Sequence, residues 1–162
     1  MMSRMDLADP GVPAAARMSF EDLYRSQYEP MVRLAYLLTQ SRAAAEDLVQ
    51  DSFVRVRPRL EGLDAPAAYL RRTVTNACYS WHRRRRRERA LPVDPPGAEE
   101  PVHDELWDAL AGLAPKRRAV LVLRYYLDLS EAEIAATLGV RNGTVKSLCS
   151  RGLADLRQVI QP

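Results

Sequence analysis

Apolar residues recur at intervals of three and four along most of the chain, which is the period of one face of an α-helix. The first such series runs from Phe20 to Leu38, and the last runs from Val145 to Leu156. Strand signals are absent. Residues 120–127, VLVLRYYL, could pass for a strand, but their helical flanks and length favour a helix. The pattern therefore predicts an all-α protein.

Residues that begin or end helices divide this pattern into segments. Ser19 followed by Asp22 is a plausible N-cap. Proline interrupts a helix, so Pro58 should end or bend the second segment, and Pro66 suits the first turn of the third. These signals predict helices near residues 19–38, 41–57, 66–81 and onward into an arginine run, 106–113, 115–127, 131–138 and 142–156.

A proline-rich stretch separates two groups of helices. Residues 91–103, LPVDPPGAEEPVH, contain four Pro, one Gly and three acids. Proline at this density breaks helices and stiffens a spacer. We therefore expect a flexible tail over residues 1–17, a small helical domain over 18–90, a linker over 91–103 and a second helical domain over 104–162.

Composition excludes several classes of protein. The 162 residues are 47% hydrophobic, with 24 Lys and Arg against 21 acids, so the net charge of +3 argues only weakly for nucleic acid. Cys78, Cys149, His82 and His103 do not form a zinc-ligand pattern, which favours free thiols in a reducing compartment. The N-terminus does not resemble a signal peptide, and no apolar run reaches the roughly 20 residues that span a bilayer. A cytoplasmic protein without cofactor or metal is expected.

The segment from Ser130 to Leu156 carries the pattern of a helix-turn-helix. Ser130 and Glu133 form a capping box, and Gly139 is suited to a left-handed turn. The domain would be of the winged-helix-like, three- or four-helix kind, with its second helix in the major groove. Hydrogen-bond donors that can reach phosphates or base edges lie on the outward face of that helix. They are Thr144, Lys146, Ser147, Ser150 and Arg151. The alternative is the solvated face of an ordinary helical hairpin.

Two details of this region are also predicted. We expect Asn142 to cap the last helix, and Tyr126 to face inward together with Ala119, Val120 and Leu123.

Residues 71–89, RRTVTNACYSWHRRRRRER, combine eight Arg with aromatic and amide side chains. Arginine neutralises phosphates, and the rings of Tyr79 and Trp81 offer stacking surfaces for unpaired bases. A duplex alone would need only the charge, so the combination with Asn76 favours a single strand or a melting duplex. The alternatives are a solvated polybasic helix end and contact with an anionic membrane.

A third feature is the segment AEDLVQDSFVRV, residues 45–56. Glu46, Asp47, Gln50 and Asp51 form an acidic and polar face on an otherwise apolar helix. Acids do not bind phosphate, so this face suggests a protein partner with a basic surface. The alternative is a solvated amphipathic helix.

Three segments together carry a resemblance to a known family: AEDLVQDSFVRV, AYLRRTVTNACYSWHRRRRR and LAPKRRAVLVLRYYLDLSEAEIAATLGVRNGTVKSLCSRGLADLR. They resemble the extracytoplasmic-function sigma factors of the sigma-70 family, in particular an actinobacterial SigE-like branch. The resemblance covers about residues 18–160. It implies a transcription initiation factor without catalysis, whose partners are promoter DNA and core RNA polymerase, through the β′ clamp and the β flap. Many relatives also bind an anti-sigma factor.

The resemblance further implies roles for individual residues. Residues 18–90 would be sigma domain two and residues 104–162 sigma domain four, with the linker threading through the polymerase. The helix-turn-helix face given above would contact the −35 element. The core polymerase would contact Asp47, Leu48, Gln50, Asp51 and Phe53. The −10 element would be recognised and opened by Arg72, Asn76, Tyr79, Trp81, Arg83, Arg84 and Arg85.

The chain departs from the family pattern at Leu148, where many relatives have a polar residue, and at Pro58, which interrupts a helix that usually continues. Two other functions compete with this interpretation. A simple regulator would bind DNA without polymerase, but the acidic helix and the aromatic-arginine segment speak against it. A nucleic-acid enzyme would need a metal-binding carboxylate cluster, a phosphate-binding loop or an activated nucleophile, and the sequence offers none that is convincing.

Overall fold

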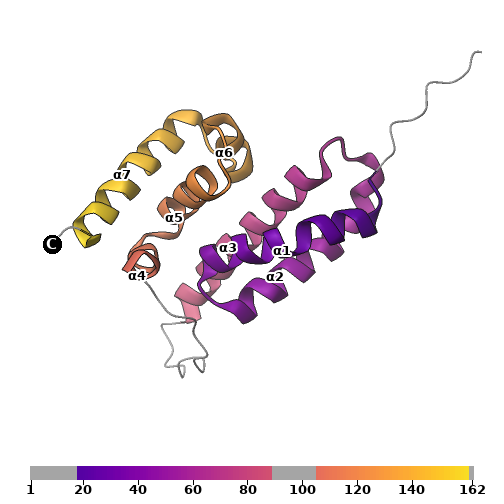
Figure 1. Ribbon diagram of the computed structural model, residues 1–162, viewed down its shortest axis with the longest axis horizontal. Coiled ribbons are helices and arrows are strands. Elements are labelled where there is room, and N and C mark those ends of the chain that lie inside the picture. Colours follow the sequence, from indigo (N-terminus) through magenta and orange to yellow (C-terminus); the bar gives the residue numbers. More distant parts are fainter. Residues whose placement is uncertain (1–17, 89–104, 161–162) are drawn as a thin grey trace, which may run out of the picture.

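The computed structural model describes residues 18–88 and 105–160. Its first group of helices is a bundle (Figure 1) of α1 (Phe20–Thr39), α2 (Arg42–Val56) and α3 (Pro66–Glu88), with a 3-10 turn, η1 (Arg57–Gly62), between α2 and α3. The Ser19 hydroxyl begins α1 by accepting a hydrogen bond from the amide of Asp22 at 3.1 Å. Pro58 lies in η1, and Pro66 opens α3. The predicted cap and both proline positions are confirmed.

The second group contains α4 (Glu105–Gly112), α5 (Pro115–Leu121), a π-helical turn η2 (Val122–Tyr126), α6 (Glu131–Leu138) and α7 (Asn142–Ile160). Helix α7 packs against α4, α5 and α6. The approach of α7 to α5 depends on Gly152, because a Cβ at this position would lie only 3.0 Å from Cδ1 of Leu121. All regular elements in the two described ranges are helical, which confirms the all-α prediction.

Two local predictions are wrong. Tyr126 is 46% exposed rather than inward, because the π turn inserts one residue and rotates the end of the helix, so that Leu127 packs against the core instead. Asn142 does not cap α7 but belongs to its first turn. The carbonyl of Arg141 accepts the first hydrogen bonds, from the amides of Thr144 at 2.9 Å and Val145 at 3.2 Å.

The two groups of helices share one hydrophobic core. Leu23, Leu34 and Val74 from the first group, and Val120 and Ile134 from the second, belong to a single cluster of buried side chains. Helices α1 and α3 lie against α5, and α3 also lies against α6. The predicted tail (residues 1–17) and linker (91–103) are outside the described residues.

Candidate nucleic-acid and protein interfaces

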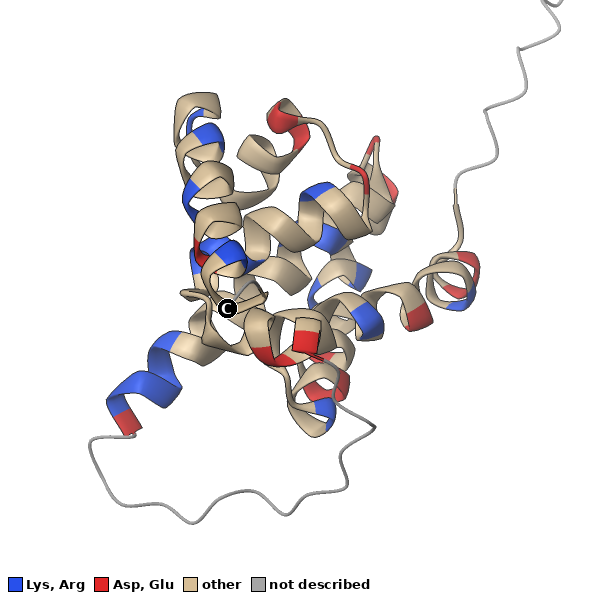
Figure 2. Ribbon diagram, turned by 60° about the vertical axis from the view of Figure 1, so that its left-hand side comes forward, with Lys and Arg blue, Asp and Glu red and all other residues tan. Residues whose placement is uncertain are grey.

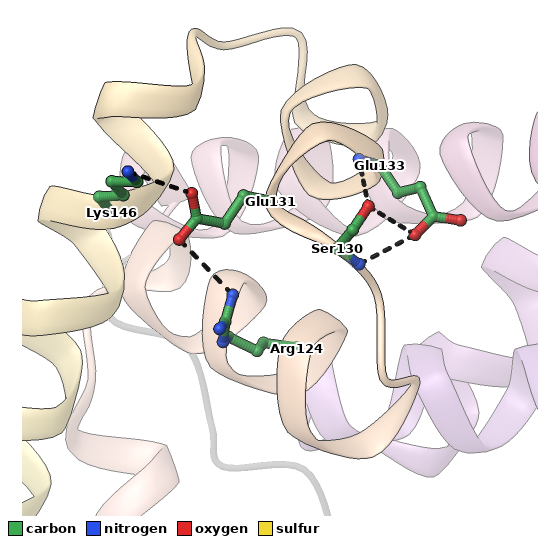
Figure 3. A network of polar contacts seen from close by, with 5 residues as sticks. All are labelled: Arg124, Ser130, Glu131, Glu133 and Lys146. Carbon is green, nitrogen blue, oxygen red and sulfur yellow. Dashed lines mark hydrogen bonds and ion pairs between the residues drawn. The ribbon is translucent and has the colours of Figure 1, made fainter.

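The helix-turn-helix corner is built by local hydrogen bonds. The Ser130 hydroxyl accepts from the amide of Glu133 at 3.3 Å, and the Glu133 carboxylate accepts from the Ser130 amide at 2.9 Å, which completes the capping box (Figure 3). The Ser130 hydroxyl also donates to the Glu133 carboxylate at 2.7 Å, and this bond, together with the one from the Ser130 amide, holds the pKa of Glu133 below its usual value. Gly139 ends α6 at φ 64°, in the left-handed region that favours glycine. The fully buried Val145 fixes the start of α7 against the core.

The outward face of α7 is available for binding. All of the residues predicted to contact the −35 element are exposed: Thr144, Lys146, Ser147, Ser150 and Arg151. Leu148 is half-buried and packs against the core, which accounts for an apolar residue at this position.

An acidic residue on α6 lies beside one of these groups. The carboxylate of Glu131 lies 3.7 Å from the Lys146 ammonium and 3.7 Å from the Arg124 guanidinium (Figure 3). Lys146 remains 69% exposed, so the pair is screened by solvent and weak. The arrangement places one negative charge beside the cationic face of α7.

Helix α3 presents its predicted DNA-contacting residues on different sides. Arg72, Asn76, Arg83 and Arg84 are exposed, and the basic run forms a continuous cationic end of α3 (Figure 2). Trp81 is half-buried against the core, and the half-buried Arg85 lies over its ring at 5.0 Å from the centroid. Trp81 is therefore an anchor for Arg85 in this conformation rather than an open stacking surface.

Tyr79 lies apart from the exposed side of α3. It is half-buried, and its hydroxyl has no hydrogen-bond partner among the described residues. Burial raises the pKa of this phenol. The exposed stacking surface expected from Tyr79 is therefore not presented in this conformation.

A groove of about 370 Å³ runs between α2 and α3. It is lined on one side by Leu48, Asp51 and Arg55, and on the other by Asn76, Ala77, Ser80, Arg83, Arg84 and Arg87. The structure thus brings Asn76 and two of the predicted arginines together, and places them next to the acidic helix. Sequence reasoning missed Arg55, Ser80 and Arg87, although their helical spacing from Asp51, Asn76 and Arg83 could have identified them.

The predicted polymerase-binding residues of α2 separate into two groups. Asp47, Gln50 and Asp51 are exposed, whereas Leu48 is 8% and Phe53 2% exposed. Phe53 contacts the rings of Phe20, Tyr24 and Tyr28, with the Tyr24 centroid at 4.9 Å. Direct contact of Phe53 with a partner is therefore not available in this conformation, because its ring is the centre of an aromatic cluster in the core.

Within the described ranges, no group of three or more His, Cys, Asp or Glu residues is placed to hold a metal ion. Burial raises the pKa of the Cys78 thiol to about 12. None of the helices in these ranges is both long and apolar enough to cross a membrane.

Comparisons with known proteins match both halves of the chain. The family model "Sigma-70 region 2" matches residues 23–88, and "Sigma-70, region 4" matches residues 103–156. The RNA polymerase sigma-E factor of Streptomyces avermitilis is 36% identical over 154 residues, which cover 89% of this chain and 86% of that protein. The ECF RNA polymerase sigma factor SigE of Mycolicibacterium smegmatis is 36% identical over 162 residues, covering 90% of this chain and 63% of its own length.

A solved structure is similar over nearly the same range. The sigma factor RpoE from Bartonella quintana, crystallised with the anti-sigma factor NepR, superposes with a TM-score of 0.71 at 25% identity. The superposition covers 88% of this chain and 96% of that one.

Proposed function

The chain belongs to the extracytoplasmic-function sigma factors of the sigma-70 family, and we propose that it directs core RNA polymerase to promoters by binding the −35 element through α7 and opening the −10 element through α3. The resemblance inferred from the motifs is thereby confirmed. The observation that carries the proposal is the pairing, in one chain, of an exposed Asn76–arginine face on α3 with a capped helix-turn-helix. The protein acts in the cytoplasm as an initiation factor, and the catalysis is that of the polymerase.

The −35 contact uses the N-terminal half of α7, because the N-terminal part of a recognition helix enters the major groove. Lys146→Ala and Arg151→Ala should each weaken promoter binding and lower the salt dependence by about one phosphate contact. Arg157→Ala is the matched control, since Arg157 is exposed on the same helix near its far end. Unchanged affinity in the Lys146/Arg151 double variant would exclude α7 as the recognition helix.

Strand opening uses the groove side of α3. Capture of an unpaired base by Asn76, with phosphates held by Arg83 and Arg84, offsets the unpairing cost of a few kcal/mol. Asn76→Ala should reduce open-complex formation, measured by permanganate reactivity, more than closed-complex binding, measured by footprinting. Gln158→Ala supplies an exposed amide control. Equal loss of both complexes would contradict a role for Asn76 in opening.

Polymerase binding uses the exposed acids of α2. Fixing both DNA-binding domains on one enzyme makes promoter recognition bivalent. Asp47→Ala and Asp51→Ala should lower affinity for core polymerase, whereas Glu61→Ala, an exposed acid on η1, should not. A run-off assay with core polymerase tests the whole proposal, because a simple DNA-binding regulator would give no promoter-dependent transcript.

The Bartonella relative was crystallised with an anti-sigma factor. We propose that this chain also has a partner of that class, which a copurification from its native source would identify.

A further inference from the structure

Polar side chains converge on the groove between α2 and α3. Four arginines, one carboxylate, one amide and one hydroxyl line it: Arg55, Arg83, Arg84 and Arg87, then Asp51, Asn76 and Ser80. All of these side chains are exposed, and none takes part in a hydrogen bond or ion pair within the described ranges. The cations and the carboxylate of the groove are therefore available to a ligand.

The cations stand at both ends of this groove. Helices α2 and α3 run in opposite directions (Figure 1), so the last turn of α2, which carries Arg55, lies beside the earlier turns of α3. Arg83 and Arg87, in the last turns of α3, lie toward the opposite end. Asp51 is one turn before Arg55, and Ser80 is about one turn before Arg83, so the carboxylate and the hydroxyl lie between the two sets of cations. A ligand of matching charge is negative at both ends and has hydrogen-bond donors at its centre.

The groove also has an apolar floor of limited size. Leu48 is 8% exposed, and the other apolar lining residue, Ala77, is half-buried. The volume of about 370 Å³ lies at the small end of the range for ligand sites, about 300–1,000 Å³. These dimensions suit one nucleobase with its sugar, because a base has apolar faces for the floor and a polar edge for the side chains above it.

The chemistry of the lining distinguishes between bases. Guanine carries two adjacent acceptors, O6 and N7, which arginine binds in a bidentate manner, and an amino group at C2 that a carboxylate can accept. Adenine has an amino group but lacks the O6 acceptor, and thymine has no amino group. Arginines combined with the single carboxylate of Asp51 therefore favour guanine.

We propose that this groove binds a free guanine nucleotide with phosphates on both the 5′ and the 3′ side of its sugar, and that the bound nucleotide competes with the promoter strand for α3. Arg55 at one end and Arg83, Arg84 and Arg87 at the other hold the phosphates, and Asp51 accepts from the base. The competition rests on the proposed role of Asn76 and the arginines in strand opening. The binding site itself does not, because it requires neither DNA nor polymerase.

Direct binding is measured by isothermal titration calorimetry on the full chain, with guanosine 3′,5′-bisphosphate as the ligand. The salt concentration is about 0.15 M, where charges separated by more than roughly 8 Å are screened. We expect one nucleotide per chain, with adenosine 3′,5′-bisphosphate binding several-fold more weakly and inorganic pyrophosphate more weakly still. Equal affinities for the three ligands would show only general attraction of anions to the basic end of α3, and would overturn the site.

Arginine variants locate the phosphates. Arg55→Ala and Arg87→Ala should each weaken binding of guanosine 3′,5′-bisphosphate by roughly ten-fold, because each removes a charge-assisted hydrogen bond. Arg86→Ala is the matched control, since Arg86 is an exposed neighbour in the same basic run that does not line the groove. Circular dichroism checks that the helices of each variant are intact. An equal loss of affinity in Arg86→Ala would also overturn the site.

A carboxylate variant tests recognition of the base. Asp51→Asn should reduce the preference for guanine over adenine several-fold without weakening the binding of pyrophosphate, because it removes an acceptor and a negative charge together. Glu61→Gln, at an exposed acid of η1, is the control and should keep the parent's preference. An unchanged preference in Asp51→Asn would exclude Asp51 as the group that reads the base.

Competition is measured with core polymerase and promoter DNA, as permanganate reactivity of the opened strand with and without guanosine 3′,5′-bisphosphate. The nucleotide should lower the reactivity several-fold with the parent and much less with Arg55→Ala. Undiminished inhibition with Arg55→Ala would place the effect on the polymerase and overturn the competition. A parent that binds the nucleotide but never supports transcription would refute the proposed function and leave the site standing, whereas transcription without nucleotide binding would refute the site alone.

Discussion

Replacing Phe53 tests whether this residue belongs to the core or to the polymerase interface. The family pattern predicts a contact residue, but the structure places the ring among Phe20, Tyr24 and Tyr28 with 2% exposure. Truncating a buried Phe to Ala costs about 3–5 kcal/mol of the free energy of unfolding. For a chain of this size, each kcal/mol lowers Tm by about 2–4 °C, so Phe53→Ala should lower it by roughly 6–20 °C.

The informative variant is Phe53→Leu, which keeps most of the apolar volume. It should lose about 1–2 kcal/mol, mostly from the aromatic pairs, and remain folded at 25 °C. Thermal unfolding by circular dichroism gives the stability, and fluorescence titration with core polymerase well below Tm gives the affinity. Val54→Ala is the control, because the adjacent Val54 side chain is 71% exposed and should change stability by about 0.5 kcal/mol or less.

If the ring is a core element, Phe53→Leu keeps the parent's polymerase affinity while Asp51→Ala loses affinity without losing stability. The reasoning fails if folded Phe53→Leu loses as much affinity as Asp51→Ala. That result would mean that α2 releases the ring from the aromatic cluster when polymerase binds.

Three further outcomes are expected. Hydrogen bonds from Ser130 lower the pKa of Glu133, so the capping box should contribute its full stability at pH values above the unfolded pKa near 4.5. That contribution should be lost as the pH falls through the lower folded pKa of Glu133. The corresponding part of the pH dependence of Tm should be absent in Glu133→Gln. Gly152→Val should destabilise the fold by about 1–3 kcal/mol in urea unfolding, since its side chain would meet Leu121. Glu131→Gln should tighten promoter binding at low salt and leave it nearly unchanged at high salt, because it removes a negative charge beside α7.

Local chemistry explains which parts of the fold could be predicted. Ser19, Ser130 and Gly139 act within a few residues of their own positions, and all three begin or end helices as expected. The π turn at residues 122–126 could not be foreseen, because a single inserted residue leaves the apolar pattern of α5 almost unchanged while reversing the orientation of Tyr126. The candidate site shows the same limit. Helical spacing predicts the exposed acids of α2, but it does not distinguish a buried Phe53 from one that contacts a partner.

The consecutive cations Lys116, Arg117 and Arg118 show why the hydrogen bond from Arg118 to the end of α1 was not predictable. Successive residues of a helix point about 100° apart, so three in a row cannot share one environment. Lys116 is exposed, Arg117 forms an ion pair with Asp155 of α7, and Arg118 is buried. A charged triplet on a helix that packs on two sides must turn one member inward, which the sequence alone could suggest. The hydrogen-bond acceptor of Arg118, however, is the backbone carbonyl of Leu38, 80 residues earlier. Every residue has a backbone carbonyl, so the residue type at position 38 does not indicate this contact. The contact between α1 and α5 is therefore encoded by the end of α1, whatever residue stands at position 38, and by the arginine at position 118.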